Sequence, residues 1–328
     1  MGPSRIRNVV LVGHGGAGKT TLAEALLHAA GLTTRMGRIE DGNTVTDFEP
    51  EEIERASSVG LAVAPFEWAD HKINLVDTPG YADFVGDVRA GLRACDLALF
   101  VVSGVDGVEV QTEILWRMAA EEGLARAVFV SKLDRERADY RRTLDQLKQR
   151  FGTGIAPVEV PIGAEASLEG VAGIVSNRAF LYDGIDPGGK EAEIPEEVRS
   201  QVEDVRTALV EAVVESDDDL LERYFEGEEP TDAQLIEGLR AGIGEGTIFP
   251  VLCGSATQLI GIDRLADLVV RDAPRPGERS LPALAAGNGF SATPDGPVVA
   301  YVFKTMSDPY VGRISLFRVY SGTLKLDT

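Results

Sequence analysis

The sequence predicts an α/β fold in which helices cover both faces of a mostly parallel sheet. Apolar runs alternate along the chain with segments of helical spacing, which is the pattern of parallel strands joined by crossover helices. The first run, residues 8–12, is continuously apolar, which indicates a strand buried on both faces. The composition, 44% hydrophobic and 26% charged in 328 residues, is that of an ordinary globular protein.

The elements of this sheet follow one another through the first 157 residues. Behind the strand at 8–12, helical spacing over 19–30 ends at Gly31. Two strands then flank a turn at Asp70-His71, and helices and strands alternate after them. We expect strands at 61–69, 72–77, 96–103 and 126–132, and helices at 84–95, 109–123 and 139–152.

The pattern changes twice in the second half of the chain. Residues 158–189 are rich in Gly and Pro with short β-like pieces, and 191–246 predict two or three helices before a strand and a helix resume the first pattern. Near the end, two segments alternate as antiparallel strands, too few to close a barrel. The domains expected are a first domain at 1–157 and 247–275, an inserted α/β subdomain at 158–246, a linker at 276–297, and the start of a truncated β-barrel domain at 298–328.

The charge of the chain is strongly negative and unevenly placed. Lys and Arg number 32 and Asp and Glu 53, a net charge of −21, which argues against non-specific binding of nucleic acid. Residues 191–246 hold 18 acidic residues against four arginines. Such a segment is either a solvated helical surface or a docking site for a basic partner.

The remaining composition indicates a cytoplasmic protein. The two cysteines, Cys95 and Cys253, and three histidines form no zinc pattern, and a disulfide framework is not expected. The apolar run before the first glycines is too short for a signal peptide. No apolar stretch reaches the roughly 18 residues that a membrane span needs, so we expect no membrane contact.

A phosphate-binding loop joins the first strand to the first helix. The eight residues match the pattern G-x-x-x-x-G-K-[ST], in which glycines leave backbone N–H groups free to wrap an anion at a helix N-terminus. Lys19 is expected on the β- and γ-phosphates of a nucleotide, and the Thr20 hydroxyl on Mg²⁺. The nucleotide-binding residues predicted here are Gly13, His14, Gly15, Gly16, Ala17, Gly18, Lys19, Thr20 and Thr21.

A second phosphate-side motif, Asp77-Thr78-Pro79-Gly80, ends the strand at 72–77. A carboxylate at the tip of an apolar strand is costly without a partner, and Mg²⁺ next to a phosphate loop supplies one, through a water. The Gly80 N–H is expected to sense the γ-phosphate, which makes a nucleotide-dependent switch possible.

Two further strand ends carry residues suited to reading a base. Ser131-Lys132-Leu133-Asp134 follows one strand, and Gly254-Ser255-Ala256 follows another. The Asp134 carboxylate can accept hydrogen bonds from guanine N1–H and N2–H₂, which adenine does not offer. The Lys132 stem can cover the face of the base, and the Ala256 N–H can donate to guanine O6.

These motifs, in this order, resemble a translational GTPase of the bacterial elongation factor G type. The stretch DTPGYADFVGDVRAGLRACDLALFVVSGVDGVEVQTEILWR, the piece EVPIGAEASLEGVAGIV with the acidic helices, and DPYVGRISLFRVYSGTL are similar to that family. The resemblance implies the P-loop GTPase fold with an inserted subdomain and the beginning of domain II. It also implies GTP hydrolysis on the ribosome, for translocation or recycling, and contact of the insert with the ribosomal stalk.

Four departures from the family suggest a divergent paralogue. Gly16 stands where the family has Asp, Tyr81 where it has the His that places the attacking water, and Ser131 where it has Asn. A hydroxyl makes fewer contacts than an amide, which predicts a modest loss of nucleotide affinity. In place of Arg-Gly-Ile-Thr the chain reads Arg55-Ala56-Ser57-Ser58, so Ser58 is expected as the Mg²⁺ ligand, with Ser57 as the alternative.

Three functions follow from these residues. The first is a GTPase that is slow without a partner, in which Lys19, Gly80 and Tyr81 carry the catalysis. The second is a GTP-dependent switch, in which residues 41–60 and 77–86 reorganise and hydrolysis is negligible because of Tyr81 and Ser131. The third is an ATPase, which equal affinity for ATP and GTP would indicate.

Overall fold

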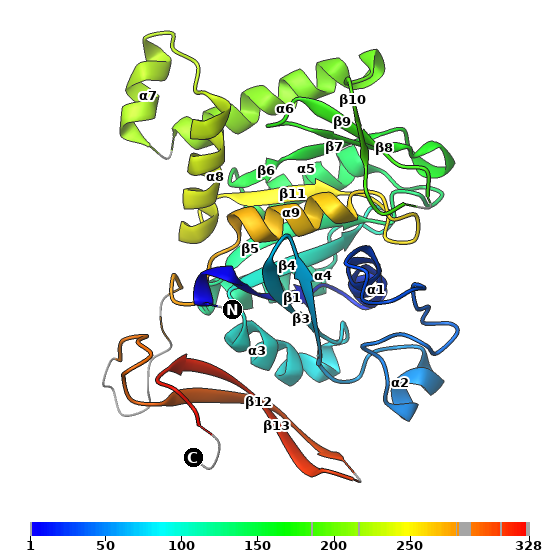
Figure 1. Ribbon diagram of the computed structural model, residues 1–328. Helices are drawn as coiled ribbons and strands as arrows, with labels where there is room; N and C mark the ends of the chain where they lie inside the picture. Colours follow the sequence, from blue (N-terminus) through cyan, green and yellow to red (C-terminus); the bar gives the residue numbers. More distant parts are fainter. Residues whose placement is uncertain are drawn as a thin grey trace.

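A seven-stranded sheet is the main feature of the computed structural model, which describes residues 2–184, 186–215, 217–279, 281, 290–308 and 310–325. The strand order is β2-β3-β1-β4-β5-β11-β6 (Figure 1). All neighbours are parallel except β2 and β3, which form an antiparallel pair. The strands are β1 (Ile6–Val12), β2 (Ala62–Trp68), β3 (His71–Asp77), β4 (Leu97–Ser103), β5 (Ala125–Ser131), β6 (Ile155–Pro157) and β11 (Phe249–Cys253).

Helices cover both faces of this sheet. The crossovers from β1 to β3 and from β3 to β4 run in opposite directions along the sheet, so right-handed connections place α1 and α3 on opposite faces. Helix α9 packs beside α1. All seven residues of β4 are buried, as expected for a strand covered on both sides. The predicted fold class is confirmed. These helices are α1 (Lys19–Ala29), α2 (Pro50–Arg55), α3 (Val85–Ala94), α4 (Val110–Glu121), α5 (Tyr140–Phe151) and α9 (Ile262–Asp272).

A second, antiparallel sheet with three helices lies beside the first, at the top of Figure 1. Its order is β10-β9-β8-β7, and it consists of β7 (Glu159–Ile162), β8 (Gly170–Gly173), β9 (Arg178–Leu181) and β10 (Lys190–Ala192). The helices are α6 (Glu196–Val214), α7 (Asp218–Phe225) and α8 (Asp232–Glu245), and α8 returns to pack against β5 and β11. The change from one sheet to the other falls at residue 158.

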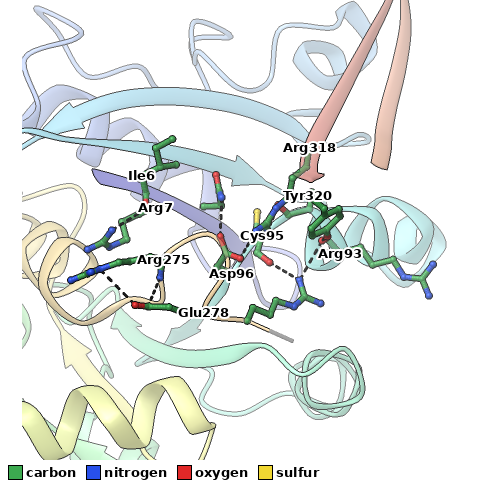
Figure 2. A network of polar contacts seen from close by, with 12 residues as sticks. Ile6, Arg7, Arg93, Cys95, Asp96, Arg275, Glu278, Arg318 and Tyr320 are labelled. Atoms are coloured by element: carbon green, nitrogen blue, oxygen red, sulfur yellow. Dashed lines mark hydrogen bonds and ion pairs between the residues drawn. The ribbon is translucent and has the colours of Figure 1, made fainter. Parts of the chain in front are cut away.

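A hairpin of β12 (Val299–Asp308) and β13 (Gly312–Ser321) follows the linker and packs along α3 (Figure 1). The two strands predicted from the sequence, at 298–305 and 313–322, are therefore confirmed, with somewhat different bounds. Figure 2 shows how the hairpin is attached: Arg318 forms an ion pair with Asp96, and the Tyr320 hydroxyl donates to the carbonyl oxygen of Arg93. In the predicted linker, Arg279 donates to the Cys95 carbonyl oxygen at 2.7 Å.

Several short elements were not predicted. Helix α2 lies in the segment between α1 and β2, β6 forms the outer strand of the main sheet, and β10 forms the edge of the second sheet. Short 3₁₀ turns occupy Pro3–Arg5, Ala82–Phe84 and Glu165–Ser167, the last inside a predicted Gly/Pro-rich region. Among the described residues, no helix combines the length and apolar character needed to cross a bilayer.

Candidate functional site

All the predicted motifs lie at one edge of the seven-stranded sheet. The phosphate loop 13–20 follows β1, and residues 254–256 follow β11. Residues 77–80 and 131–134 begin at the last residues of β3 and β5. These four strands are parallel, so their carboxyl ends meet at the same edge. Ligands of open α/β sheets bind at this edge.

The phosphate loop depends on its glycines. Gly13, Gly16 and Gly18 have φ values of +151°, +81° and +100°, where side chains other than glycine are strained. A Cβ atom on Gly13 would lie 2.4 Å from the Val101 carbonyl oxygen. The loop therefore lies directly on β4, and Gly18 turns the chain into the first turn of α1.

Lys19 is buried and directed into the loop. Its Nζ donates to the carbonyl oxygens of Gly13 (3.0 Å) and His14 (2.9 Å). Burial lowers the pKa of Lys19 to about 8, although the neighbouring Asp77 carboxylate acts in the opposite direction. Burial also lowers the pKa of His14. Thr21 is half-buried in the first turn of α1. The loop thus presents a desolvated ammonium group together with backbone amides, a combination suited to a polyanion.

Asp77 is buried at the end of β3 and accepts hydrogen bonds from two hydroxyl groups. The Thr20 and Thr46 hydroxyls donate to its Oδ2 at 2.8 and 3.1 Å. Burial raises the pKa of Asp77 to about 6, while Lys19 opposes that effect. Within the described residues, Asp77 Oδ1 has no hydrogen-bond partner. Burying a carboxyl group with one unpaired oxygen costs folding free energy unless a cation or a water molecule binds that oxygen.

Ser58 joins the same cluster from the other end of the segment. The sequence offered Ser57 and Ser58 as alternative Mg²⁺ ligands. In the structure, the Ser58 hydroxyl lies 3.1 Å from the Thr20 hydroxyl. Burial raises the pKa of Asp47, and a hydrogen bond from Ser58 acts in the opposite direction. Asp47 Oδ2 has no hydrogen-bond partner in the part of the chain that the structure describes.

The cluster offers oxygen ligands. The described residues contain no group of three or more His, Cys, Asp or Glu side chains that could hold a metal by themselves. Hydroxyl and carboxyl oxygens, two of them buried without a partner among the described residues, nevertheless suit a hard divalent cation whose other ligands are phosphate oxygens and water. The side chains that could hold such a cation are Thr20, Thr46, Asp47, Ser58 and Asp77.

Gly80 and Tyr81 lie against the phosphate loop. A Cβ atom on Gly80 would lie 2.5 Å from Lys19 Nζ and 2.6 Å from the Gly15 nitrogen, so only glycine fits there. The Tyr81 ring lies over Gly15, where a Cβ atom would be 3.2 Å from two ring carbons. Tyr81 is 55% exposed. Its phenol is therefore beside the loop and open to solvent or to a partner.

Ser131 and Lys132 connect the base-reading motif to the phosphate loop. The Ser131 hydroxyl donates to the Ala17 carbonyl oxygen at 2.7 Å, and Lys132 Nζ donates to that of Gly16 at 2.5 Å. Lys132 adopts a φ of +59°, which turns the chain at the end of β5. The Ser131 contact is made to the loop backbone, so this serine acts by holding two motifs together.

Asp134 is held by a hydroxyl from the other base-side loop. Thr257 Oγ1 donates to Asp134 Oδ2 at 3.1 Å and lies 3.1 Å from the Ser255 hydroxyl. Gly254 lacks room for a side chain, because a Cβ atom would lie 2.0 Å from the Ile260 carbonyl oxygen. Ala256 follows Ser255 and is buried. The two loops thus meet at the Asp134 carboxylate.

The sequence analysis did not single out five residues of this region, although three of them lie in the segment 41–60 that it expected to reorganise. Thr46 and Asp47 belong to no motif that the sequence displays, and Thr257 is one residue beyond a predicted motif. Besides burial itself, two buried glutamates that lie close to Asp47 raise the pKa of its carboxyl group. The residues missed are Glu24, Thr46, Asp47, Glu52 and Thr257. The only signal in the sequence for Glu24 is its spacing of one helical turn from Thr20.

Comparisons with known proteins show the family to which the chain belongs. Residues 4–275 match the family described as elongation factor Tu GTP binding domain. The whole chain is similar, at 43% identity, to the elongation factor G-like proteins of two Mycobacterium tuberculosis strains, CDC 1551 / Oshkosh and ATCC 25618 / H37Rv. A solved structure from Thermus thermophilus is similar over 98% of the chain, with a TM-score of 0.87 and 39% identity. The chain spans 46% of the length of each of these relatives.

Proposed function

The chain belongs to the elongation factor Tu GTP-binding domain family, and we propose that it binds and hydrolyses GTP as an elongation factor G-like protein acting on the ribosome. The observation that supports this most directly is the meeting of the phosphate, DTPG and base-side motifs at one sheet edge. The phosphates would lie at the N-terminus of α1, and the base between the loops after β5 and β11.

The oxygen cluster supports a magnesium ion next to the phosphates. We assign the Thr20 and Ser58 hydroxyls as direct ligands and the Asp77 carboxylate as a ligand through water. The absence of a partner for Asp77 Oδ1 among the described residues supports this assignment. When bound, Mg²⁺ neutralises charge on the phosphate oxygens. Lys19 would leave the loop carbonyls for the β- and γ-phosphates, which offer a buried ammonium stronger partners.

Guanine selection would rest on Asp134. Its carboxylate accepts from the guanine N1–H and 2-amino groups, whereas adenine would leave it unpaired. The Thr257 hydroxyl already holds one oxygen in place, so the carboxylate is oriented before the base arrives. The Lys132 stem would cover the base, and the Ala256 N–H would donate to guanine O6.

Gly80 and Tyr81 would act at the γ-phosphate. The Gly80 N–H would donate to a γ-phosphate oxygen, and the Tyr81 hydroxyl would orient the attacking water. Tyrosine supplies a hydrogen bond but is a poor proton acceptor, so turnover is expected to be slow until a partner completes the positioning of the water. The exposure of Tyr81 leaves it open to such a partner.

The same residues support a second candidate function, a GTP-dependent binding switch with negligible hydrolysis. Tyr81 in place of a histidine is the observation that favours it. A wild-type protein that binds GTP without turnover, together with a large rise in turnover for Tyr81→His, would establish the switch. Unchanged turnover in this variant would argue against a role of residue 81 in limiting hydrolysis.

The acidic subdomain is the proposed contact for a ribosomal stalk protein. Helix α7 projects from the molecule (Figure 1) and exposes 81% of Phe225 among acidic neighbours. An exposed aromatic ring framed by negative charge suits a basic partner with an apolar pocket.

We further propose that residues 1–157 and 247–275 are the GTP-binding domain, 158–246 the insert and 298–328 the start of a β-barrel, in a cytoplasmic protein.

Phosphate release from GTP by the full-length protein, with and without ribosomes, tests the proposed function. We expect slow release alone and strong stimulation by ribosomes, with Lys19→Ala inactive in both conditions. GTP binding without stimulation would reject a translocase-like or recycling role and leave the switch. Equal affinity for ATP and GTP would overturn the assignment of Asp134 and revive an ATPase.

A further inference from the structure

Two buried glutamates hold the segment that crosses the proposed magnesium site. This segment, residues 37–60, runs between α1 and β2, contains α2, and carries Thr46, Asp47 and Ser58. Glu24 on α1 is 1% exposed and Glu52 on α2 is 3% exposed. Neither glutamate belongs to the oxygen cluster itself.

Glu24 binds the first half of the segment at two points. Its Oε2 accepts the Gly37 N–H at 3.0 Å, and its Oε1 accepts the Val45 N–H at 2.5 Å. Glu24 follows Thr20 by one helical turn, so the same face of α1 carries both side chains. Gly37 is closely fitted to this carboxyl group, because a Cβ atom there would lie 2.5 Å from Glu24 Oε2.

Glu52 binds the second half in a similar way. Its Oε1 accepts the Val59 and Gly60 N–H groups at 3.0 and 3.2 Å. Its Oε2 accepts the Glu49 N–H at 3.2 Å and closes the first turn of α2. The carboxyl group therefore ties α2 to the chain that leads into β2.

Each glutamate fixes a residue adjacent to a hydroxyl of the oxygen cluster. Val45 precedes Thr46, which donates to Asp77, and Val59 follows Ser58, which contacts Thr20. Buried carboxylates need several donors, and hydrogen bonds to a charged acceptor are about twice as strong as neutral ones. Two such groups, each bonded to two or three backbone N–H groups, set the position of the segment over the site.

We propose that Glu24 and Glu52 are positioning residues for GTP hydrolysis: they hold residues 37–60 so that Thr46, Asp47 and Ser58 reach the γ-phosphate and magnesium side of the nucleotide. This inference rests on the proposed function. A triphosphate with its cation needs the segment in this place, whereas a diphosphate is held mainly by the phosphate loop. Among the described residues, the hydrogen bonds of both glutamate side chains go to residues 37–60 and not to that loop. The proposal therefore concerns the preference for GTP over GDP.

The decisive measurement compares affinities for GDP and for a non-hydrolysable GTP analogue across a magnesium titration. Glu24→Gln keeps the shape of the side chain but turns an N–H donor toward a backbone N–H. We expect the affinity for the analogue to fall about tenfold, and the affinity for GDP to change by less than about twofold. Faster hydrogen exchange of residues 37–46 in the analogue complex is expected as well.

Two further variants and a control make the result independent of the folding of Glu24→Gln. Gly37→Ala disturbs the same contact from within the segment, where its Cβ would also press on the Asn43 carbonyl oxygen, and leaves the side chains of α1 unchanged. Glu52→Gln tests the second half of the segment. Both should lower the affinity for the analogue selectively. Glu51→Gln, an exposed neighbour of Glu52 on the same helix, loses the same charge and should bind both nucleotides as the wild type does.

The outcomes separate this inference from the proposed function. A wild-type protein that binds no guanine nucleotide would overturn the proposed function and the positioning role together. Normal binding by the wild type with an unchanged analogue affinity in Gly37→Ala and Glu52→Gln would overturn the positioning role alone. Parallel losses of affinity for GDP and the analogue would also overturn it, because they would indicate a merely structural role.

Discussion

At the scale of single residues, the Asp134 carboxylate is the group that we propose reads the purine. One of its oxygens accepts the Thr257 hydroxyl, so the side chain is already oriented. A carboxylate at this position would accept hydrogen bonds from guanine, and an amide would turn one acceptor into a donor. In the proposed site, the identity of this single group would therefore decide which purine binds.

For Asp134→Asn we expect the affinity for GTP to fall by roughly 100-fold or more, because the amide N–H faces the donors of guanine. Xanthine carries a carbonyl where guanine has its 2-amino group, so XTP should bind the variant better than GTP does. Competition binding with GTP, XTP and ATP measures this. An unchanged ratio of GTP to XTP affinity would show that Asp134 does not contact the base.

Ser131 illustrates a residue whose partner the sequence could not reveal. A serine in place of asparagine suggested weaker contacts, and the structure shows that the hydroxyl donates to the Ala17 carbonyl oxygen, 114 positions away. Thr46 and Asp47 are similar cases: their place beside Asp77 and Ser58 depends on how the segment between α1 and β2 folds back, which no local pattern encodes.

For Ser131→Ala we expect the free energy of unfolding to fall by about 1–2 kcal/mol, because the buried Ala17 carbonyl oxygen loses its donor. Urea unfolding measures the loss. Ser200→Ala, on the exposed face of α6, should change stability by less than about 0.5 kcal/mol and serves as the control. Equal stabilities of the two variants would show that the Ser131 hydroxyl contributes nothing net.

At the scale of elements, strong periodicity of apolar residues predicted most of the main sheet. Elements that are short or only weakly periodic were not predicted. Strand β4 and helix α5 have long, clear patterns and were found. Helix α2 has only six residues and exposes its single large apolar side chain, Ile53, so it shows no amphipathic pattern. Strands β6 and β10 have three residues each, and their pairing with β11 and β9 is a tertiary property.

Strand β7 carries a buried carboxyl group at the junction of the two sheets. Burial raises the pKa of Glu159 to about 8 from an ordinary 4.5, while Arg264, whose Nε lies 3.9 Å away, acts in the opposite direction. Glu159 Oε2 has no hydrogen-bond partner among the described residues. Between pH 4.5 and about 8, Glu159 is therefore expected to keep its proton in the folded protein and to lose it in the unfolded chain.

From this pKa we expect the contribution of Glu159 to stability to fall as the pH rises from about 4.5 to about 8, with a limiting slope of about 1.4 kcal/mol per pH unit. Glu159→Gln should flatten the pH dependence of unfolding in this window and raise stability near pH 8. Urea midpoints at several pH values measure it. Glu193→Gln, an exposed residue of the same region, should follow the wild-type curve, and a parallel curve for Glu159→Gln would contradict the prediction.

At the scale of the whole molecule, the sheets are joined by polar contacts between segments far apart in the chain. The sequence predicted the two strands of the terminal hairpin from their alternation. The sequence did not indicate that Arg318 forms an ion pair with Asp96, 222 positions earlier. Such a pairing depends on the docking of the hairpin against α3. Composition likewise located the acidic helices without revealing that α8 packs on the main sheet.

The contact of Arg318 with Asp96 extends into the main sheet (Figure 2). Arg318 Nη2 lies 2.6 Å from Asp96 Oδ1, and Arg318 also donates to the Ala94 carbonyl oxygen at the end of α3. Asp96 Oδ2 accepts from Asn8, whose own side chain accepts from Asn74. Hydrogen bonds thus run without interruption from the hairpin through β1 to β3, the strand that ends at the proposed magnesium site.

We expect Arg318→Met to destabilise the protein by about 3 kcal/mol, because Asp96 is 1% exposed and would remain buried without its cation. Arg313→Met, on the same strand but exposed, should cost less than about 0.5 kcal/mol. Urea unfolding of both variants measures the difference, and limited proteolysis within β12 and β13 shows whether the hairpin leaves α3. The double variant Arg318→Met/Asp96→Asn should recover part of the loss, since no charge is then left buried. Equal stabilities of the two single variants would mean that apolar contacts, and not this ion pair, hold the hairpin on the main sheet.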